Sequence, residues 1–311
     1  INFPLLEIET IIEESRINSL RFAIKKLDDY DILIFVSKNA VQYGSAIIKE
    51  NRHKLPINSE VIAIGPVKAK MASDFFGCEV IHPENGSVKR FADSSRVPVI
   101  NAGDGSNEHP SQALLDLYTI QKELSENNKT LDGLRIALVG DLKYGRAVHS
   151  LCKILSFYSN VKLNLISPKE LKLPPELLNQ LNESGLSLSE TENLEEGISE
   201  VDIIYVTRIQ EERFKNKSDA NKYRGLLSLN QSIYTANCEP NTVIMHPLPR
   251  DSRSDANELD SDLYENPNLA IFRQADNGVV IRMAMFALVL GVEDKIEESS
   301  KLVNWKVGLD N

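Results

Sequence analysis

Short runs of apolar, mostly β-branched residues alternate along the chain with longer amphipathic stretches. The apolar runs are Asp31–Val36, Glu60–Gly65, Val97–Asn101, Leu134–Val139, Val161–Ile166, Val201–Val206 and Val243–Met245. Amphipathic stretches such as Ser111–Leu124 and Gly145–Phe157 have the apolar spacing of helices. Strands that are separated by helices predict parallel sheets, and near-continuous apolar strands predict sheets covered on both faces. We therefore expect an α/β fold with two parallel-sheet, three-layer units.

Length and charge set the first limits on function. The chain has 311 residues, enough for two domains with separate cores, and a formal net charge of -10 at pH 7. An acidic chain has no electrostatic reason to bind nucleic acid or an anionic membrane surface, so we expect neither as a partner. A local cluster of arginines can still bind a small anionic substrate.

Cysteine usage and hydropathy bear on the cellular compartment. The three cysteines are Cys78, Cys152 and Cys238. Their spacing fits neither a CxxC pair nor a zinc site, so we expect free thiols, no metal and a reducing, cytoplasmic location. The longest apolar run, Met283–Leu290, is too short to span a bilayer, and the start of the chain lacks a leader pattern. Because the chain opens within a predicted strand, Phe3–Ile8, we expect further residues before it.

The segment Asn101–Gln112 reads NAGDGSNEHPSQ and precedes the amphipathic run Ala113–Ile120. Its glycines and Asp/Asn residues are typical of a loop, and Pro110 suits a first helical position. A strand, a turn and a helix would explain this much, but not why His109 and Gln112 stand together at the helix start. The helix dipole should lower the pKa of His109, so that the neutral ring can donate a hydrogen bond to a carbonyl oxygen in acyl transfer.

This segment resembles the signature of the aspartate and ornithine carbamoyltransferases. In that family the corresponding His and Gln contact the carbamoyl group of carbamoyl phosphate, which implies catalytic roles for His109 and Gln112. The resemblance runs from about Ser87 to Gly291 and implies that residues 87–311 form the aspartate-binding domain. Residues 272–290 resemble the family's closing helix, which crosses back to pack on the amino-terminal domain.

The segment Val139–Arg146 reads VGDLKYGR, a strand end followed by a glycine-containing turn into a helix. This geometry favours an anion, although the GxGxxG spacing of dinucleotide-binding turns is absent. Arg146 falls in the first helical turn, where its guanidinium and free backbone N–H groups can meet the same anion. The run resembles the family segment whose Arg binds the substrate carboxylate. The resemblance implies substrate-binding roles for Arg146 and for the accompanying Lys143 and Tyr144.

The segment Tyr205–Arg213 reads YVTRIQEER and starts at the end of a buried strand. Arg208 and Gln210 therefore follow a strand's carboxyl end, where parallel sheets carry their ligands. A forked guanidinium suits bidentate recognition of a carboxylate. The run resembles the family's second aspartate clamp, so that Arg146 and Arg208 would each hold one carboxylate. We expect Glu211, Glu212 and Arg213 to form a solvated helix face.

The segment Met245–Arg250 reads MHPLPR, in which two prolines fix the backbone direction. It resembles the family loop whose Leu-Pro carbonyls face the substrate, which implies substrate contacts for Leu248 and Pro249. Ornithine enzymes carry a Cys-containing HCLP version, so the HPLP run favours aspartate. We expect structural or surface roles for His82, His149 and His246.

Residues 1–86 do not carry the rest of the family pattern. The Ser-Thr-Arg-Thr type motif for phosphate is absent from them, and Ile81 stands where a phosphate-contacting Arg is expected. Four runs instead resemble uroporphyrinogen-III synthase: Phe3–Ile8, Tyr30–Val41, Ala63–Ala69 and Gly77–Asn85. We hypothesise a chimera, natural or artefactual, whose first domain comprises residues 1–86 and whose join lies near residues 82–86. A divergent carbamoyl phosphate domain is the alternative.

The family resemblance implies a reaction without a cofactor. The L-aspartate amine attacks the carbonyl of carbamoyl phosphate, giving N-carbamoyl-L-aspartate, a pyrimidine precursor, and phosphate. Family members are homotrimers with shared active sites, so a homo-oligomer is expected. Because charge-assisted phosphate contacts are missing, we expect weak or absent activity from this chain alone. Two alternatives remain: a uroporphyrinogen-III synthase-derived chimera and a non-catalytic aspartate-binding protein.

Overall fold

The computed structural model divides into two compact units, Ile1–Ser87 and Val88–Asn311. The structure describes residues 21–22, 24–29, 32–35, 40–51, 60–63, 66–80, 87–95, 98–105, 107–214, 216–251, 253 and 255–296. The predicted strand Phe3–Ile8 and the segment 81–86, with Ile81, His82 and the proposed join, lie outside these residues. The identity of the first unit therefore stays a hypothesis at these positions.

The described part of the first unit is a small α/β arrangement. Strand β1 (Ile32–Phe35) pairs in parallel with β2 (Glu60–Ala63), and both fall within predicted apolar runs. The helical segments here are η1 (Leu27–Asp29), η2 (Ala40–Gly44), α2 (Ser45–Asn51) and α3 (Pro66–Phe76). The core brings β1 and α3 together, with the rings of Phe35 and Phe76 5.6 Å apart.

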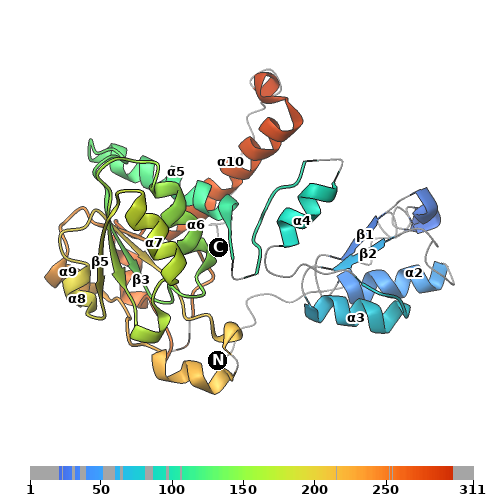
Figure 1. The fold of residues 1–311 in the computed structure, drawn as a ribbon, viewed down its shortest axis with the longest axis horizontal. Helices are drawn as coiled ribbons and strands as arrows, with labels where there is room; N and C mark the ends of the chain where they lie inside the picture. Colours follow the sequence, from blue (N-terminus) through green and yellow to red (C-terminus); the bar gives the residue numbers. More distant parts are fainter. Residues whose placement is uncertain are drawn as a thin grey trace, which may run out of the picture. The chain divides into compact units, whose positions relative to one another are not determined.

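The second unit is built on a five-stranded parallel sheet (Figure 1). Its strands are β3 (Arg135–Val139), β4 (Lys162–Ile166), β5 (Ser187–Thr191), β6 (Ile203–Val206) and β7 (Val243–Met245). The spatial order is β5-β4-β3-β6-β7, and Val139 is in register with both Ile166 and Val206. After β3 the chain adds β4 and β5 on one side of β3, and it then adds β6 and β7 on the other side. Ligands of parallel sheets bind at such a reversal of strand order.

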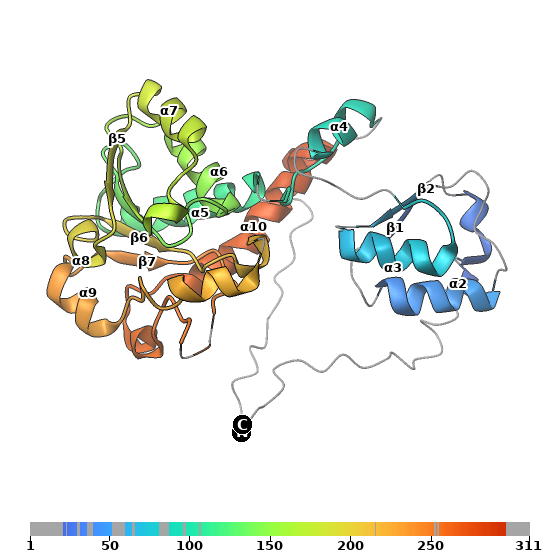
Figure 2. The ribbon, with the colours of Figure 1, turned by 60° about the horizontal axis from the view of Figure 1, so that its bottom comes forward.

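Helices cover both faces of this sheet, as the strand pattern predicts. Along β3, Ile136 and Leu138 face one core, whereas Ala137 and Val139 face the other. The first core is shared with α5 (Pro110–Glu126), α6 (Arg146–Leu155) and α7 (Pro175–Glu183). The second core includes residues next to or within α8 (Leu194–Gly197), α9 (Gln231–Asn237) and η6 (Ser261–Glu265). Figure 2 shows the two helical layers on opposite sides of the strands.

The remaining helical segments are short, apart from one long helix. They are α4 (Ser87–Ser94), η3 (Lys169–Leu171), η4 (Glu211–Arg213), η5 (Lys217–Tyr223), α10 (Ile271–Leu290) and η7 (Glu293–Lys295). No helix in the described part of the chain is long and apolar enough to cross a membrane.

The prediction of a strand at Val97–Asn101 is wrong. The described residues 98–101 belong to no strand and run as coil towards α5. Pro98 has no N–H to donate to a ladder, and Val99 and Ile100 are only half-buried. β-branched residues alone do not form a strand where no neighbouring strand supplies hydrogen bonds.

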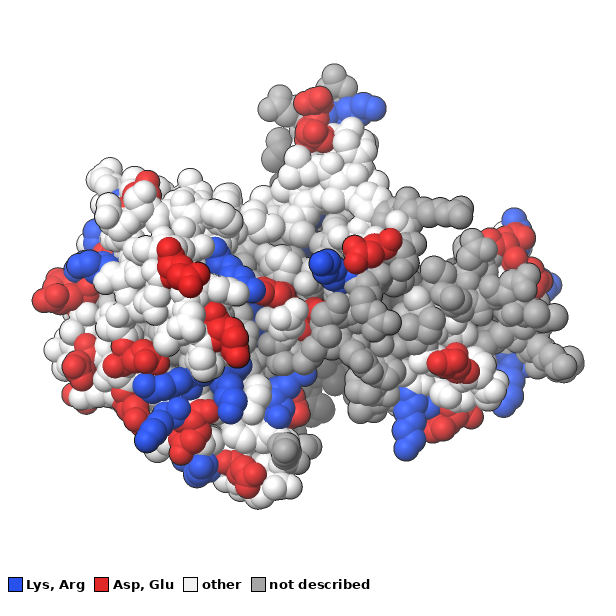
Figure 3. All heavy atoms as spheres, in the orientation of Figure 1, with Lys and Arg blue, Asp and Glu red and all other residues white. Residues whose placement is uncertain are grey.

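Helix α10 is anchored at its beginning and exposed towards its end. Arg273 Nε lies 2.7 Å from Glu123 Oε1, and Asn277 Nδ2 donates to Thr119 Oγ1 at 3.0 Å, so the first turns are fixed on α5. Beyond Gly278, one side of the helix carries an apolar ridge. This α10 ridge consists of Val279, Met283, Phe286 and Leu290, which are 58%, 64%, 58% and 69% exposed. Figure 3 shows this end of the helix as mostly uncharged surface.

Candidate active site

The carboxyl ends of β3 and β6 are held together at the point where the strand order reverses. Gly140 follows β3 with φ +114°, and a Cβ there would lie 2.2 Å from Thr207 O, so only glycine permits this approach. Asp141 comes next and is fully buried. Its two carboxylate oxygens accept the backbone N–H groups of Tyr144 and Gln210, each at 3.0 Å. One carboxylate therefore ties together the two loops that carry the arginines.

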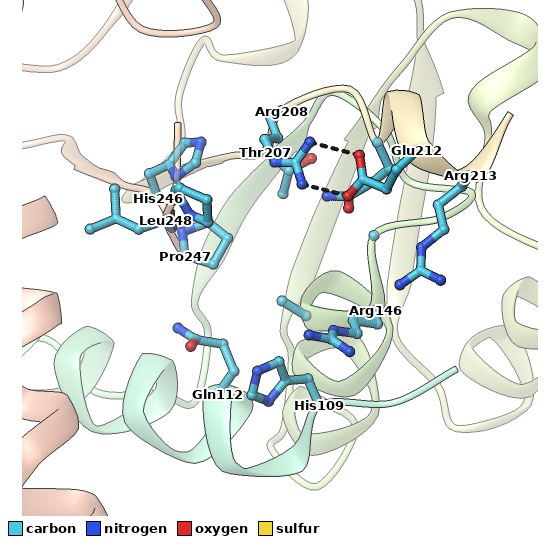
Figure 4. Close-up of a pocket in the computed structure, with 14 residues that line it drawn as sticks. His109, Gln112, Arg146, Thr207, Arg208, Glu212, Arg213, His246, Pro247 and Leu248 are labelled. Carbon is cyan, nitrogen blue, oxygen red and sulfur yellow. Dashed lines mark hydrogen bonds and ion pairs between the residues drawn. The ribbon is translucent and has the colours of Figure 1, made fainter. Parts of the chain in front are cut away.

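A cavity of about 160 Å³ opens at this point. Seven of the sequence-predicted residues line it: His109, Gln112, Arg146, Arg208, Gln210, Leu248 and Pro249. Figure 4 shows how they converge: His109 and Gln112 come from the start of α5, and Arg146 lies beside them. Arg208 and Leu248 face the same space from the loops after β6 and β7. The cavity thus brings the guanidinium groups of Arg146 and Arg208 and the imidazole of His109 to the edge of one space.

His109 is the residue immediately before α5. Its backbone N–H donates to Ser150 Oγ at 2.9 Å, and Ser111 Oγ lies 3.3 Å from its Nδ1. The pKa of His109 is lowered to about 4, first by burial and then by the positive charges of Arg146 and Arg282. The direction of this pKa shift was predicted from the sequence, where the helix dipole was given as its cause. The ring is therefore neutral at pH 7.

Arg146 begins helix α6 and lies against a glycine. A Cβ on Gly103, which has φ +116°, would be 2.8 Å from the Arg146 Cζ. The Arg146 Nη1 donates to Gly105 O at 3.2 Å, and Arg213 Nη2 donates to the same carbonyl at 2.9 Å. The pKa of Arg146 is lowered by burial and by the nearby Arg213. This local excess of positive charge favours an anionic ligand although the whole chain is acidic.

Arg208 is held by a carboxylate of its own loop. Its Nη1 and Nη2 donate to Glu212 Oε2 and Oε1 at 3.0 and 2.6 Å, and Nη1 also donates to Ile209 O at 3.2 Å (Figure 4). A guanidinium has five N–H donors. The Nε edge of Arg208 is not used by these bonds, so a bidentate edge remains for a second carboxylate.

The loop after β7 is fixed from both sides of His246. The backbone N–H of His246 donates to Gln274 Oε1 at 2.9 Å, and His246 Nδ1 accepts the Leu248 N–H at 2.8 Å. Its Nε2 lies 2.8 Å from Glu258 Oε1. His246 is 1% exposed and lines the cavity with Pro247, so the expected structural role of this histidine includes shaping the site.

Lys143 and Tyr144 do not line this cavity. They line a second one of about 510 Å³, in which the Tyr144 ring lies 5.6 Å from that of Phe214 and Lys143 Nζ lies 5.3 Å from the Tyr144 centroid. The physical reason is the turn itself. Because Asp141 binds the Tyr144 N–H, the Tyr144 side chain packs towards η5 instead. The structure thus separates these two from the other predicted residues.

The prediction that Glu211, Glu212 and Arg213 form a solvated helix face is confirmed in part, because Glu212 and Arg213 are exposed on a short helix, but these two residues also belong to the site. Glu212 and Arg213 line the cavity, and the Glu211 carboxylate pairs with Arg224 and Arg253, each at 2.7 Å. The three residues form a single 3-10 turn, which is shorter than the expected helix. The sequence signal that could have found Glu212 is its i,i+4 spacing from Arg208.

Within the described residues there is no cluster of three or more His, Cys, Asp or Glu that could hold a metal ion. Burial raises the pKa of the Cys152 thiol to about 12 and that of Cys238 to about 11. Neither thiol is therefore poised to act as a nucleophile at neutral pH. The chemistry of the cavity rests on guanidinium, imidazole and amide groups.

Comparison with known families agrees with this geometry. The family model described as aspartate/ornithine carbamoyltransferase, Asp/Orn binding domain, matches residues 132–289. The chain belongs to the aspartate/ornithine carbamoyltransferase family. The model of the family's carbamoyl-P binding domain matches residues 66–122, on both sides of the proposed join at residues 82–86. The resemblance of residues 1–86 to uroporphyrinogen-III synthase gains no support from this match and stays a hypothesis.

Sequence relatives are catalytic subunits of aspartate carbamoyltransferase. The chain is 62% identical over 224 residues to the subunit from Saccharophagus degradans, covering 72% of this chain and 66% of the relative. It is 45% identical over 211 residues to that from Thermococcus onnurineus, covering 68% and 64%. The chain thus spans slightly less than two thirds of the length of these relatives.

Solved structures of the family have a similar fold. Aspartate transcarbamoylase from Trypanosoma cruzi, in complex with carbamoyl aspartate and phosphate, is 28% identical with a TM-score of 0.60, covering 92% of this chain and 74% of that one. The catalytic subunit from M. jannaschii is 27% identical with a TM-score of 0.56, covering 91% and 96%.

Proposed function

We propose that this chain is an aspartate carbamoyltransferase, which transfers the carbamoyl group of carbamoyl phosphate to L-aspartate. The observation that carries the proposal is the convergence of Arg146, Arg208 and His109 on one cavity. L-Aspartate has two carboxylates and one amine. Two arginine forks can hold the carboxylates and leave the amine directed at an acyl group.

The carbamoyl end of the substrate pair lies at the start of α5 in this proposal. When Ser111 Oγ donates to His109 Nδ1, the proton of the neutral ring is on Nε2, which then donates to the carbamoyl oxygen. This hydrogen bond strengthens as negative charge develops on that oxygen during attack by the aspartate amine. Gln112 contacts the same carbamoyl group. Phosphate then leaves, and no cofactor is required.

The charge of the cavity favours aspartate over ornithine. Arg213 lines the cavity together with Arg146 and Arg208. Glu212, which also lines the cavity, is already paired with Arg208. The cationic side chain of ornithine would meet a net positive surface, and like charges at close range are repulsive. The solved T. cruzi relative holds carbamoyl aspartate and phosphate, in agreement with this choice.

Turnover by this chain alone is expected to be weak. The Ser-Thr-Arg-Thr type phosphate motif does not occur in residues 1–86 of the sequence. We propose that the chain acts as a homo-oligomer, with trimers as the family precedent, in the cytoplasm. Ligand binding is therefore the more sensitive test of the site, and turnover is the test of the complete reaction.

The experiment combines a binding and a product measurement on the full chain. Isothermal titration calorimetry at pH 7 should detect L-aspartate in the presence of phosphate, with L-ornithine as the matched control that should not bind. Incubation with carbamoyl phosphate should then yield N-carbamoyl-L-aspartate slowly. Addition of a full-length family subunit should raise the rate if that subunit supplies the missing phosphate contacts. Equal binding of ornithine and aspartate, or binding of neither, would refute the proposal.

A further inference from the structure

A single buried carboxylate lies behind the cavity and connects three elements. The Asp116 side chain is completely buried and does not line the cavity. Its Oδ1 accepts the Nε2 groups of Gln112 at 2.9 Å and Gln274 at 2.6 Å, and its Oδ2 accepts the Tyr205 hydroxyl at 2.6 Å. The three donors come from α5, α10 and β6. Each is neutral, so the carboxylate is compensated by hydrogen bonds and not by an ion pair.

The first of these bonds fixes the orientation of the Gln112 amide. An ionised carboxylate can only accept hydrogen bonds, so the NH2 end of Gln112 must face Asp116. A flipped amide would place Gln112 Oε1 against a carboxylate oxygen inside a dry core, where an unpaired acceptor is costly. The amide oxygen is therefore the end that Gln112 offers to a ligand in the cavity.

The second bond places the loop after β7 by the same logic. Because Gln274 Nε2 is taken by Asp116, Gln274 Oε1 is turned to the other side and accepts the His246 backbone N–H at 2.9 Å. His246 in turn accepts the Leu248 N–H at 2.8 Å. A continuous chain of hydrogen bonds thus runs from Gln112 through Asp116 and Gln274 to the loop on the opposite wall of the cavity.

We propose that Asp116 is a positioning residue that fixes the Gln112 amide oxygen towards the cavity and sets the 246–248 loop against it. Gln112 then selects a ligand whose carbamoyl end presents an N–H group. This inference rests on the proposed function, because it concerns the carbamoyl half of the same site. An apolar residue at position 116 would leave both glutamine amides without this acceptor.

Three variants separate positioning from simple stabilisation. Asp116→Ala removes the acceptor for both glutamines. Asp116→Asn keeps an oxygen at the Oδ1 position and can turn its NH2 group towards the Tyr205 oxygen, so it is the conservative rescue. Tyr205→Phe removes the third hydrogen bond to the same carboxylate but leaves both glutamines attached to it. It is therefore the matched control for loss of a buried bond.

The ligands separate the two halves of the site. Succinate carries the two carboxylates of aspartate without a carbamoyl group, whereas N-carbamoyl-L-aspartate carries both parts. In calorimetric titrations at pH 8, Asp116→Ala should lower the affinity for N-carbamoyl-L-aspartate about tenfold, as expected for a lost hydrogen bond. The affinity for succinate should stay within about twofold of the wild-type value. Asp116→Asn and Tyr205→Phe should leave both affinities within about twofold of wild type.

Two results would overturn the inference. One is an unchanged affinity of Asp116→Ala for N-carbamoyl-L-aspartate, and the other is an equal loss of affinity for both ligands. If the wild-type chain binds neither ligand, the proposed function fails, and a second readout decides the positioning role. In spectra of chain labelled with 15N-glutamine, the side-chain amide protons of Gln112 and Gln274 should exchange slowly in wild type and Tyr205→Phe. They should exchange fast in Asp116→Ala; slow exchange in that variant contradicts the inference.

Discussion

The guanidinium of Arg208 is fixed by the carboxylate of Glu212 through two hydrogen bonds, at 2.6 and 3.0 Å, inside the cavity wall. Arg208 and Glu212 are four residues apart, on either side of the irregular start of η4. The ion pair lowers the net positive charge of this wall. It also holds the Arg208 side chain in one orientation, with its Nε edge free of these two bonds. The balance between these two effects can be measured.

Glu212→Ala should weaken binding of succinate. Without Glu212 the long Arg208 side chain regains rotamer freedom, which must be lost again when a carboxylate binds. We expect a fall in affinity of about tenfold by titration calorimetry. Glu211→Ala is the matched control, since Glu211 pairs with Arg224 and Arg253 but does not line the cavity. Tighter binding by Glu212→Ala would mean that charge repulsion, and not orientation, dominates.

Gly103→Ala should displace Arg146. The new Cβ would lie 2.8 Å from the Arg146 Cζ, and the backbone at φ +116° is unfavourable for alanine. We expect dicarboxylate affinity to fall by at least about tenfold, as for a lost charge-assisted hydrogen bond. Gly133→Ala is the control, because φ there is +80° but no atom lies within 4 Å of the added Cβ. It should lose stability without losing affinity; a similar affinity loss in both variants would contradict this account.

His109 should titrate far below an ordinary histidine. Its folded pKa of about 4 lies below the reference value of 6.5, so protonation disfavours the folded state. The contribution of His109 to stability is complete above pH 6.5 and is lost as the pH falls towards 4. Removing one of the cationic causes with Arg282→Met should raise the pKa, which should still stay below 6.5 because burial remains. Proton NMR of the ring measures both values, and a midpoint near 6.5 in wild type would contradict the prediction.

Asp116 should affect stability with the opposite sign. Its pKa is raised from 3.8 to about 6, first by burial, with the hydroxyl and amide donors acting against the shift. Its contribution to stability is therefore fully present below pH 3.8 and is lost as the pH rises through 6. The shift corresponds to about 3 kcal/mol. In denaturant unfolding, the free energy of unfolding of Asp116→Asn minus that of wild type should increase as the pH rises from 4 to 8. A pH-independent difference would be evidence against the raised pKa.

The α10 ridge predicts concentration-dependent association. Four large apolar side chains at helical spacing are more than half exposed, and contiguous exposed apolar surface favours association. The double variant Met283→Lys with Phe286→Lys should sediment as a smaller species than wild type at the same concentration. Phe157→Lys is the control, because Phe157 is 84% exposed but follows α6 and is not part of the ridge. A monomeric wild-type chain would show that the ridge does not associate.

The regular parts of the second unit could be predicted from sequence because periodicity and burial coincide there. The strands at 135–139 and 203–206 lie within the expected runs, and the residues that follow them line the cavity. Residues 98–101 have a similar composition but pair with no strand in the described part of the chain, a property that no local pattern encodes. The direction of the His109 pKa shift was accessible from its place before a helix, whereas its main cause, burial, depends on tertiary packing.

Residues whose role depends on contacts distant in sequence were missed. Asp116 sits among apolar residues of an amphipathic helix, and its partners Tyr205 and Gln274 are 89 and 158 positions away. Only the Gln112–Asp116 spacing of four residues was visible as a signal. Glu212 and Arg213 are exposed as predicted, but their place in the cavity wall was missed because it depends on how their loop packs against the loops that carry Arg208 and Arg146.

The central claim is that Arg146 and Arg208 hold the two carboxylates of one ligand in a shared cavity. Titration of N-carbamoyl-L-aspartate into wild type, Arg146→Met, Arg208→Met and the double variant tests it most directly. The account predicts that each single variant loses about tenfold or more in affinity and that the double variant binds no measurable ligand. Wild-type affinity in either single variant would contradict the claim.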